Sequence, residues 1–281
     1  TSSLGAIRST FPILVQWAGV LPIKALTKAR EDGFKLFQYA DQSIRRYHGI
    51  LEKQPDLVKQ TLFTNVFKAE DNETLSMTEI RANSISYLIA GSDTTANTLT
   101  YLVWNVCQRP DIKKRLVDEL KTLPDDFTEA DLRDLKYLTH VIDEALRLHG
   151  AVQNAMPRAV PEGGASFLGH YLDQGTTVSC QGYSMHRIET VYPDAEEFDP
   201  SRWETATRAM KDAFMAFGKG SRNCLGLHLA RIELRLAAAM FFIKFPDSET
   251  SALEGMSDED MKPSIFFITN PKGRRCLIEA K

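Results

Sequence analysis

Several features that mark other protein classes are absent or scarce in this sequence. Cysteine occurs four times, with no CxxC pair, at Cys107, Cys180, Cys224 and Cys276. This spacing argues against a disulfide framework and a structural zinc site, and it favours a reducing compartment. No run of about 18 apolar residues predicts a transmembrane helix, and no signal peptide is visible. The formal charge of -3 argues against a basic protein that binds nucleic acid.

The composition that is present is that of an ordinary globular protein. Of 281 residues, 43% are hydrophobic and 25% charged, which is enough for a sizeable core. No repeat, low-complexity tract or Gly/Ser linker divides the chain, so a single domain over residues 1–281 is predicted. The apolar segment 11–26, interrupted by Pro12 and Pro22, is interpreted either as a buried core helix or as a short element that contacts a membrane surface.

Helical periodicity dominates the first half of the chain. Ser76 followed by Glu79 forms a capping box before a Pro-free stretch, which predicts a long helix from Met77 to Cys107. Thr128 and Asp131 are expected to cap a later segment. Apolar spacing and Pro or Gly boundaries predict further helices over 35–51, 57–67, 112–123, 135–148 and 225–245.

The second half of the chain has a different character. Short alternating runs between 158 and 184 predict small strands and turns, and the stretch from 192 to 217 is expected to be mostly irregular. A terminal hairpin is expected to pair 265–269 with 275–278 around a turn at 270–273. The predicted fold class is therefore mainly α with a minor β part.

One cysteine lies in a glycine-rich turn directly before a predicted helix. The segment Phe217-Gly218-Lys219-Gly220-Ser221-Arg222-Asn223-Cys224-Leu225-Gly226 places its thiol at a helix N-terminus, where the helix dipole and a nearby Arg stabilise a thiolate. The glycines let the backbone approach a bulky group closely. Ligation to a macrocycle fits these features better than nucleophilic catalysis. A cysteine hydrolase is a weaker alternative, because no His or Asn spacing singles out a partner for Cys224.

This segment resembles the F-x-x-G-x-R-x-C-x-G signature of the cytochrome P450 superfamily. The match rests on Phe217, Gly220, Arg222, Cys224 and Gly226. The resemblance implies a P450-like fold that binds haem b (iron protoporphyrin IX), with Cys224 as the axial ligand of the iron. It also implies that Phe217, Gly218 and Gly226 belong to the haem-binding loop.

A second block lies in the middle of the long predicted helix. Ala90-Gly91-Ser92-Asp93-Thr94-Thr95 resembles the family's oxygen-activation motif, A/G-G-x-D/E-T-T. Glycine inside a helix costs up to about 1 kcal/mol, so its presence calls for a compensating role. The resemblance implies that Ala90 and Gly91 open a groove over the haem, and that Asp93 and Thr94 relay protons to bound dioxygen. A solvent-facing stretch rich in Ser and Thr is the alternative interpretation.

Two further blocks carry charged residues. Glu144 and Arg147 match the family's E-x-x-R, in which both side chains share one helix face. Arg202, within Phe198-Asp199-Pro200-Ser201-Arg202-Trp203, matches the Arg of the meander motif. The resemblance implies that these three residues form a buried structural triad that holds the cysteine loop in place and does no chemistry.

The remaining positions concern the haem carboxylates and the substrate pocket. The resemblance implies that Arg158, which follows Met156-Pro157, and Arg222 bind the haem propionates, and guanidinium groups suit such carboxylates. His186 is interpreted as structural and not as an axial ligand. Three residues on the long helix, the loop 151–156 and the terminal hairpin are expected to line a pocket for a mid-sized apolar ligand; the three are Ile89, Ala90 and Thr94.

The resemblance extends from about Met77 to the C-terminus and looks most like the eukaryotic, especially fungal, branch. The N-terminal portion of a family chain, with its membrane anchor, is expected to be absent. The parts of the domain expected from the resemblance are roof helices (1–75), the oxygen-activation helix (76–108), the E-x-x-R helix (135–148), strands and meander (158–216), the Cys loop and its helix (217–245) and a terminal hairpin (262–281).

The function that the resemblance implies is that of a haem-thiolate monooxygenase. It would insert one oxygen atom from dioxygen into a small apolar organic substrate of secondary metabolism. Electrons would come from an NADPH-cytochrome P450 reductase at the cytoplasmic face of the endoplasmic reticulum, since no G-x-G-x-x-G nucleotide site is visible. Two alternatives stay open: a haem-thiolate isomerase or dehydratase, and a non-catalytic fragment that acts as an interaction piece.

Overall fold

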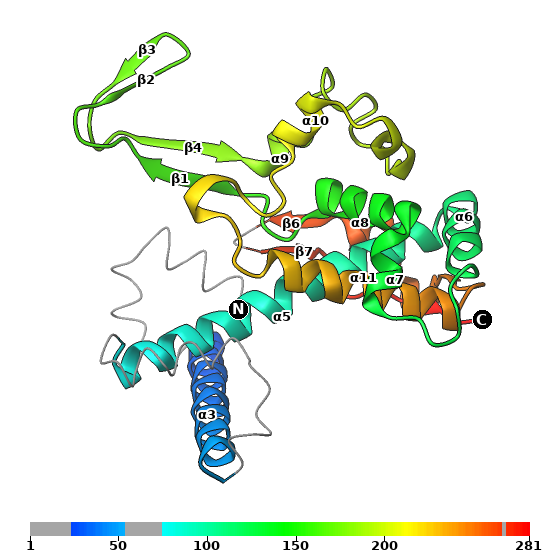
Figure 1. The fold of residues 1–281 in the computed structure, drawn as a ribbon, viewed down its shortest axis with the longest axis horizontal. Helices are drawn as coiled ribbons and strands as arrows, with labels where there is room; N and C mark the ends of the chain where they lie inside the picture. The colour runs from blue at the N-terminus through cyan, green and yellow to red at the C-terminus, as the bar shows by residue number, and fades with distance from the viewer. Residues whose placement is uncertain (1–23, 54–74, 266–267) are drawn as a thin grey trace. The chain divides into compact units, whose positions relative to one another are not determined.

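Helices make up most of the computed structural model, which describes residues 24–53, 75–265 and 268–281 (Figure 1). The fold class, mainly α with a minor β part, is as expected. The chain divides into two compact units, 1–93 and 94–281, with the boundary inside one continuous helix. The expected single domain stays a prediction. The helix expected over 57–67 lies outside the described residues, as does nearly all of the segment 11–26.

The first unit contains α3 (Lys24–Lys53) and the first half of α5 (Met77–Cys107). Helix α5 has the predicted boundaries, and α3 contains the helix predicted over 35–51. The Ser76 N–H donates to the Glu79 carboxylate at 2.7 Å, and the Glu79 N–H donates to the Ser76 hydroxyl at 3.3 Å, so the capping box forms as predicted. Ile44 and Ile80 are buried in a small apolar cluster.

The second unit is built around α8 (Lys136–His149), most of whose side chains are buried. Helix α8 packs against α6 (Pro110–Leu120), α7 (Glu129–Asp134) and α11 (Leu227–Lys244). The second half of α5 contributes to the same core. Burial of these apolar side chains is the main favourable term for this unit; they include Leu102, Val106, Leu116, Leu138, Ile142, Leu234 and Phe242.

The starts of these helices follow from local chemistry and lie within two residues of those expected. Helix α6 begins at Pro110 and not at 112, because a proline in the first turn loses no hydrogen bond. The capping box of Thr128 and Asp131 precedes α7 as predicted. Helix α8 has no side-chain cap from its own N-cap residue. Instead, the carboxylate of Glu119 on α6 accepts the N–H groups of Tyr137 and Leu138, both at 2.8 Å.

The strands in the described residues form four two-stranded antiparallel sheets. The longest pairs β1 (Ala155–Ala159) with β4 (Thr177–Gln181), and a hairpin pairs β2 (Ala165–Phe167) with β3 (His170–Leu172). Strand β5 (Glu249–Thr250) pairs with β8 (Ile278–Glu279), and β6 (Pro263–Ile265) pairs with β7 (Thr269–Pro271).

The predicted terminal hairpin is wrong in its pairing. Asn270 and Pro271, expected in a turn, belong to β7 and lie opposite Ser264 and Pro263. Proline is tolerated there because it ends a two-stranded ladder and no further strand needs its N–H. Residues 275–278 were expected to pair with 265–269. Instead, Ile278 belongs to β8, which pairs with β5 about 30 residues earlier in the chain. The predicted turn therefore gave way to a local pairing of β7 with β6 and a long-range pairing of β8 with β5.

The region between β4 and α11, expected to be mostly irregular from 192 onward, contains short helical elements. Helix α9 (Gly182–Met185) follows β4, and the 3-10 helix η2 (Pro200–Thr205) carries the meander motif. Helix α10 (Arg208–Ala213) begins after Thr207, whose hydroxyl accepts the Met210 N–H at 3.2 Å. The 3-10 turn η3 (Gly220–Arg222) then leads into α11.

Two short elements, η4 (Leu253–Gly255) and α12 (Asp258–Met261), precede β6. In the parts of the chain that the structure describes, no helix combines the length and apolar character required to cross a bilayer. All four cysteines are free thiols. Cys107 is buried and Cys180 and Cys276 are half-buried, whereas Cys224 is exposed.

Candidate functional site

The cysteine loop closes on itself through backbone hydrogen bonds. The Cys224 N–H donates to the Phe217 carbonyl at 2.8 Å, and the Gly218 N–H donates to the Met215 carbonyl at 2.9 Å. The loop thus places Cys224 just before α11, whose N-cap residue is Gly226. A thiol in this position, exposed to solvent, is presented to an external partner and not to the core.

Two glycines of this loop adopt backbone conformations that other residues rarely take. Gly218 has φ +69 and Gly220 has φ +73, both in the left-handed region. A Cβ at Gly218 would also lie 3.6 Å from the Met156 Sδ, which shows that β1 runs beside the loop. Gly226 differs, because its φ of -85 suits any residue and a Cβ there would lie 3.9 Å from the Cys224 Sγ. The lack of a side chain at Gly226 therefore leaves open space beside the Cys224 sulfur.

The donor set around Cys224 fits a metal that brings its other ligands with it. Over the described ranges, no group of three or more His, Cys, Asp and Glu could hold a bare metal ion. A single sulfur lies just before the 18-residue helix α11. A haem, which supplies four nitrogens of its own, requires one such protein ligand, so the residues present fit the expected cofactor.

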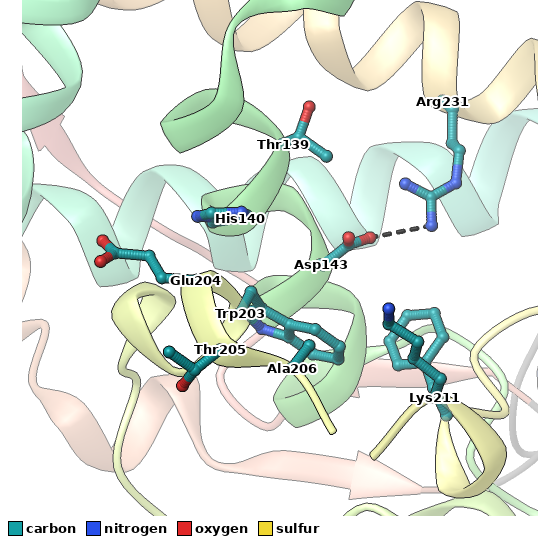
Figure 2. A pocket seen from close by; sticks show the side chains of 10 residues that line it. Thr139, His140, Asp143, Trp203, Glu204, Thr205, Ala206, Lys211 and Arg231 are labelled. Carbon is teal, nitrogen blue, oxygen red and sulfur yellow. Dashed lines mark ion pairs between the residues drawn. The ribbon is translucent and has the colours of Figure 1, made fainter. Parts of the chain in front are cut away.

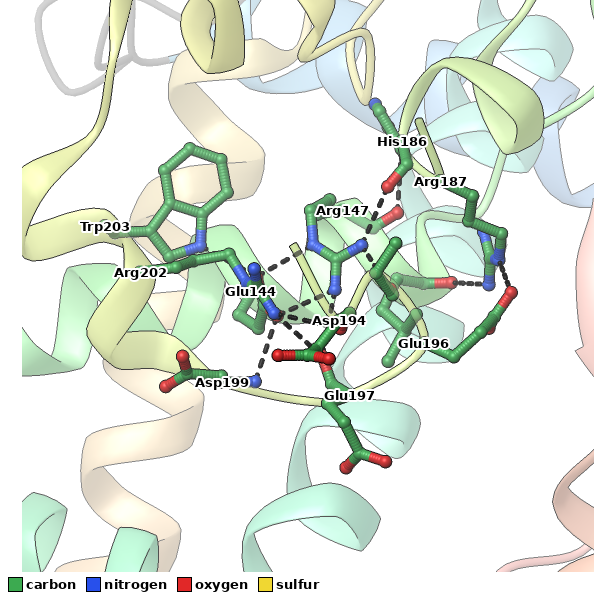
Figure 3. A network of polar contacts seen from close by, with 12 residues as sticks. Glu144, Arg147, His186, Arg187, Asp194, Glu196, Glu197, Asp199, Arg202 and Trp203 are labelled. Carbon is green, nitrogen blue, oxygen red and sulfur yellow. Dashed lines mark hydrogen bonds and ion pairs between the residues drawn. The ribbon is translucent and has the colours of Figure 1, made fainter. Parts of the chain in front are cut away.

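The expected triad comes together as a buried ion network (Figure 3). The Glu144 and Arg147 side chains are 0% exposed and the Arg202 side chain is 7% exposed. Arg147 makes a bidentate pair with Glu144, at 2.9 Å from Nε and 2.8 Å from Nη2. The Arg202 Nε donates to the same carboxylate at 2.9 Å. Buried charges require partners of this kind.

The Glu144 carboxylate accepts five hydrogen bonds in all. Besides the two arginines, the Trp203 indole N–H donates at 2.9 Å and the Asp199 backbone N–H at 3.0 Å. Both of these donors come from the meander, so α8 and η2 are joined through one carboxylate. The role of Trp203 was not predicted from the sequence. Its place directly after the meander Arg is the only signal that points to it.

The Arg147 guanidinium uses its other donors on the backbone of the meander. Its Nη1 donates to the His186 and Ala195 carbonyls at 2.8 and 2.7 Å, and its Nη2 donates to the Glu197 carbonyl at 3.0 Å. Arg202 similarly donates to the Pro193 carbonyl at 2.7 Å. The two side chains thereby supply hydrogen-bond partners to carbonyls of an irregular segment, which has no regular ladder to do so.

His186 links this network to the cysteine loop. Its Nδ1 lies 2.7 Å from the Arg147 carbonyl, and its Nε2 accepts the Met215 N–H at 2.8 Å. Because a carbonyl can only accept, Nδ1 carries the proton. Burial, together with repulsion by Arg147 and Arg187, lowers the pKa of His186 to about 4. Both ring nitrogens are therefore in use, in accord with a structural role and not an axial one.

Phe217 connects the loop to α11 and α8 through residues that sequence reasoning missed. The Arg231 guanidinium lies 5.6 Å from the centre of the Phe217 ring, and its Nη2 lies 2.8 Å from the Asp143 Oδ1. Both charged groups line a cavity of about 660 Å3 that α8, η2, α10 and α11 surround (Figure 2). Asp143 precedes the predicted triad residue Glu144, but nothing in its sequence context signals this contact.

The two propionate candidates lie on different elements, Arg158 on β1 and Arg222 in η3. Arg158 is exposed on β1, opposite Val178, and its Nη1 reaches no further than the Pro157 carbonyl at 2.8 Å. Arg222 is exposed in η3. Among the described residues neither guanidinium pairs with a carboxylate, so both can bind carboxylates from outside the chain. Their role toward haem stays a prediction.

The proton-relay candidates lie on α5, where the two units meet in the chain. Ala90, Gly91 and Asp93 are exposed in the first unit, and Thr94 is half-buried at the start of the second. A Cβ at Gly91 would meet no atom within 4 Å. The Thr98 hydroxyl donates to the Thr94 carbonyl at 2.9 Å, the usual way in which a helix satisfies a hydroxyl. That Asp93 and Thr94 face bound dioxygen stays a prediction.

Two of the segments expected to line the substrate pocket touch each other. The Thr269 N–H of β7 donates to the Ala151 carbonyl at 2.8 Å, which joins the start of the loop 151–156 to the terminal sheet. The Thr269 hydroxyl is buried, with no hydrogen-bond partner among the described residues.

Comparison with known proteins extends these observations to nearly the whole chain. The family model described as Cytochrome P450 matches residues 6–277. The curated relative Cytochrome P450 monooxygenase tazI of Aspergillus terreus is 46% identical over 99% of this chain and 57% of its own length. Cytochrome P450 monooxygenase orf2 of Aspergillus niger is 42% identical over 98% of this chain and 56% of its own length.

A further relative in Aspergillus niger, Cytochrome P450 monooxygenase azaI, is 40% identical over 98% of this chain and 63% of its own length. The chain therefore spans between 56% and 63% of the length of these three relatives. Cys224 and the residues of the Glu144 network fall within the matched range 6–277.

Proposed function

This chain belongs to the cytochrome P450 family, and from that premise we propose that it is the iron-ligating part of a haem-thiolate monooxygenase. The observation that carries the proposal is the cysteine loop. An exposed Cys224 thiol precedes α11, in a turn closed by the Phe217 carbonyl. The turn connects through Met215 and His186 to the buried charges of Glu144 and Arg147. A thiolate held this firmly suits an axial ligand.

When bound, the haem supplies the activation of dioxygen, of which one atom enters the substrate and the other leaves as water, with two electrons and two protons consumed. Cys224 would hold the iron as a thiolate. Arg158 and Arg222 would bind the two propionates, because guanidinium groups pair with carboxylates. The low side-chain volume at Ala90 and Gly91 would leave room for the flat cofactor beside α5.

The protons are assigned to α5. We assign to the Asp93 carboxylate the uptake of a proton from water, and to the Thr94 hydroxyl its delivery, since each group can accept and donate in turn. This pair also weighs against an isomerase or dehydratase, which needs no such relay. The loop 151–156 and β7 would border a pocket for a mid-sized apolar substrate.

The partners follow from what the family chemistry requires. Two electrons must come from outside the chain, and an NADPH-dependent reductase is the proposed donor. The relatives in Aspergillus are named monooxygenases. We therefore place this protein in fungal secondary metabolism and, for a chain that carries a membrane anchor, at the cytoplasmic face of the endoplasmic reticulum.

The test is an absorption spectrum of the haem-supplemented protein, reduced under carbon monoxide, beside a Cys224→Ala variant and a Cys276→Ala control. The proposal expects a strongly red-shifted Soret band in the wild type and in Cys276→Ala, and its loss in Cys224→Ala. A spectrum without bound haem, or one typical of histidine ligation that Cys224→Ala leaves unchanged, would contradict it. Such a result would favour the non-catalytic interaction piece.

A further inference from the structure

Phe217 is held through its backbone carbonyl and through its ring, by different parts of the second unit. Its carbonyl accepts the Cys224 N–H at 2.8 Å, so its backbone closes the turn that carries the thiol. Its ring lies under the guanidinium of Arg231, 5.6 Å from Cζ to the ring centre. The position of this ring therefore bears on the position of the cysteine turn.

The cation over the ring is itself held by an acidic residue of another helix. The Arg231 Nη2 lies 2.8 Å from the Asp143 Oδ1, and the two side chains are 24% and 18% exposed. The pair faces the cavity shown in Figure 2, where Arg231 would otherwise be free to turn away from the ring. Burial raises the pKa of the Asp143 carboxyl, and Arg231 opposes this rise by favouring the charged form.

We infer that Asp143 and Arg231 are positioning residues that orient the Cys224 thiolate through Phe217. A planar guanidinium can pair with a carboxylate along its edge while its face lies over a ring, whereas a lysine ammonium is a point charge without this fork. Asp143 aims Arg231, Arg231 holds the Phe217 ring, and the Phe217 carbonyl holds the Cys224 amide. The inference rests on the proposed ligation of haem by Cys224.

Two neighbouring acidic residues of α8 contact different parts of the second unit. Glu144 faces the meander and binds Arg202 and Trp203, whereas its neighbour Asp143 contacts α11. One helix thus reaches the cysteine turn by two independent routes, through His186 and through Arg231. A metal–sulfur bond tolerates only small displacements of its ligand, so a second route has a chemical purpose.

The first experiment uses the haem-loaded holoprotein with Asp143→Asn, Arg231→Lys and Phe217→Leu. The rate at which the thiolate-type band of the reduced carbon monoxide complex disappears in mild denaturant is measured. We expect each variant to lose the band roughly tenfold faster than wild type, as for a coupled contact near 1.4 kcal/mol. Arg231→Lys keeps the charge, so its effect isolates the planar group.

The chain offers a matched control on the same helix. Arg235 of α11 pairs with Glu129 of α7 and, among the ion pairs of the described residues, with no carboxylate of α8. Arg235→Lys and Glu129→Gln should lower the melting temperature without accelerating loss of the band. The inference is overturned if Asp143→Asn and Arg231→Lys lose the band no faster than these controls at equal melting temperature. It is also overturned if Phe217→Leu and Arg231→Lys have additive effects in the double variant.

A second readout separates this inference from the proposed function. Alkylation of Cys224 by iodoacetamide, followed by mass spectrometry in the protein before haem loading, reports the turn without any metal. We expect its rate to change about threefold or more in Asp143→Asn and Arg231→Lys but not in Arg235→Lys. A wild type without the thiolate band would refute the proposed function. Unchanged alkylation across all variants would refute the role of Asp143 and Arg231.

Discussion

Among single residues, Glu144 balances two buried cations with one carboxylate. Arg147 and Arg202 both donate to it, and no other carboxylate in the described residues reaches either guanidinium. We expect Glu144→Gln to lower the free energy of unfolding by about 3–5 kcal/mol, because removal of one charge leaves the others buried and unpaired. Chemical denaturation measures this change.

The matched control for Glu144 is Glu196→Gln, since Glu196 also pairs with an arginine but is 69% exposed. Its loss should change the free energy of unfolding by no more than about 1 kcal/mol, as for other surface ion pairs. Equal effects of the two substitutions would show that the buried network does not stabilise the fold.

The pH dependence of stability should report His186. Its pKa is lowered to about 4, whereas an unfolded histidine titrates near 6.5. Between these values the unfolded chain binds a proton that the folded chain excludes, so stability is lost as the pH falls from about 6.5 to 4. His149, whose pKa burial lowers to about 3, adds a second contribution of the same sign.

Substitution His186→Gln should remove one of these two contributions. The slope of unfolding free energy against pH, measured by denaturation between about pH 4.5 and 6, should then decrease by about 1.4 kcal/mol per pH unit. The slope is compared and not the absolute stability, because the variant also loses packing. Identical slopes for the variant and the wild type would contradict a neutral, buried His186.

At the scale of elements, α8 begins with a cap supplied by a different helix. The Glu119 carboxylate of α6 accepts hydrogen bonds from two backbone N–H groups in the first turn of α8. We expect Glu119→Gln to lower the free energy of unfolding by about 1–2 kcal/mol, since an amide can accept only through one oxygen and loses the charge at the helix N-terminus. Hydrogen exchange of the Tyr137 and Leu138 amides should accelerate.

The residue before Glu119 in the sequence provides the control. Asp118 lies on the same helix, 48% exposed, and pairs with Lys114. Asp118→Asn should leave the exchange of the α8 amides unchanged and affect stability by no more than about 0.5 kcal/mol. If Glu119→Gln also leaves these amides protected, the capping role is wrong.

Elements with local signals were predictable, and those set by distant partners were not. Helix α5 follows from the Ser76 capping box and its freedom from proline, and it has the expected ends. The terminal hairpin failed because residues 270–273 favour a turn locally, whereas β7 pairs with β6 directly before it and β8 pairs with β5, about 30 residues earlier in the chain.

The same distinction applies to the site. Cys224, Glu144 and Arg202 were predicted from motifs that resemble those of the family, and the structure brings the latter two together. The contacts of Trp203, Asp143 and Arg231 arise from packing between segments that are 59 or more residues apart. No local pattern records such an encounter, because burial and charge pairing are decided only when the helices meet.

For the molecule as a whole, the cysteine turn depends on groups spread from α8 to α11. Arg147, His186 and Met215 form one continuous series of hydrogen bonds into the turn, and Asp143 and Arg231 form the second route. A ligand that binds only the folded arrangement must therefore stabilise all of these segments together. Haem is the ligand that this chain is proposed to hold.

Titration with haem should accordingly raise the melting temperature of the entire chain. At a free concentration 100 times the dissociation constant, the gain in folding free energy is about 2.7 kcal/mol, and Cys276→Ala should show the same gain. Cys224→Ala should show a much smaller shift, because it lacks the iron ligand while the fold around it is unchanged. Equal shifts in both variants would mean that haem associates with exposed apolar surface and not with the cysteine turn.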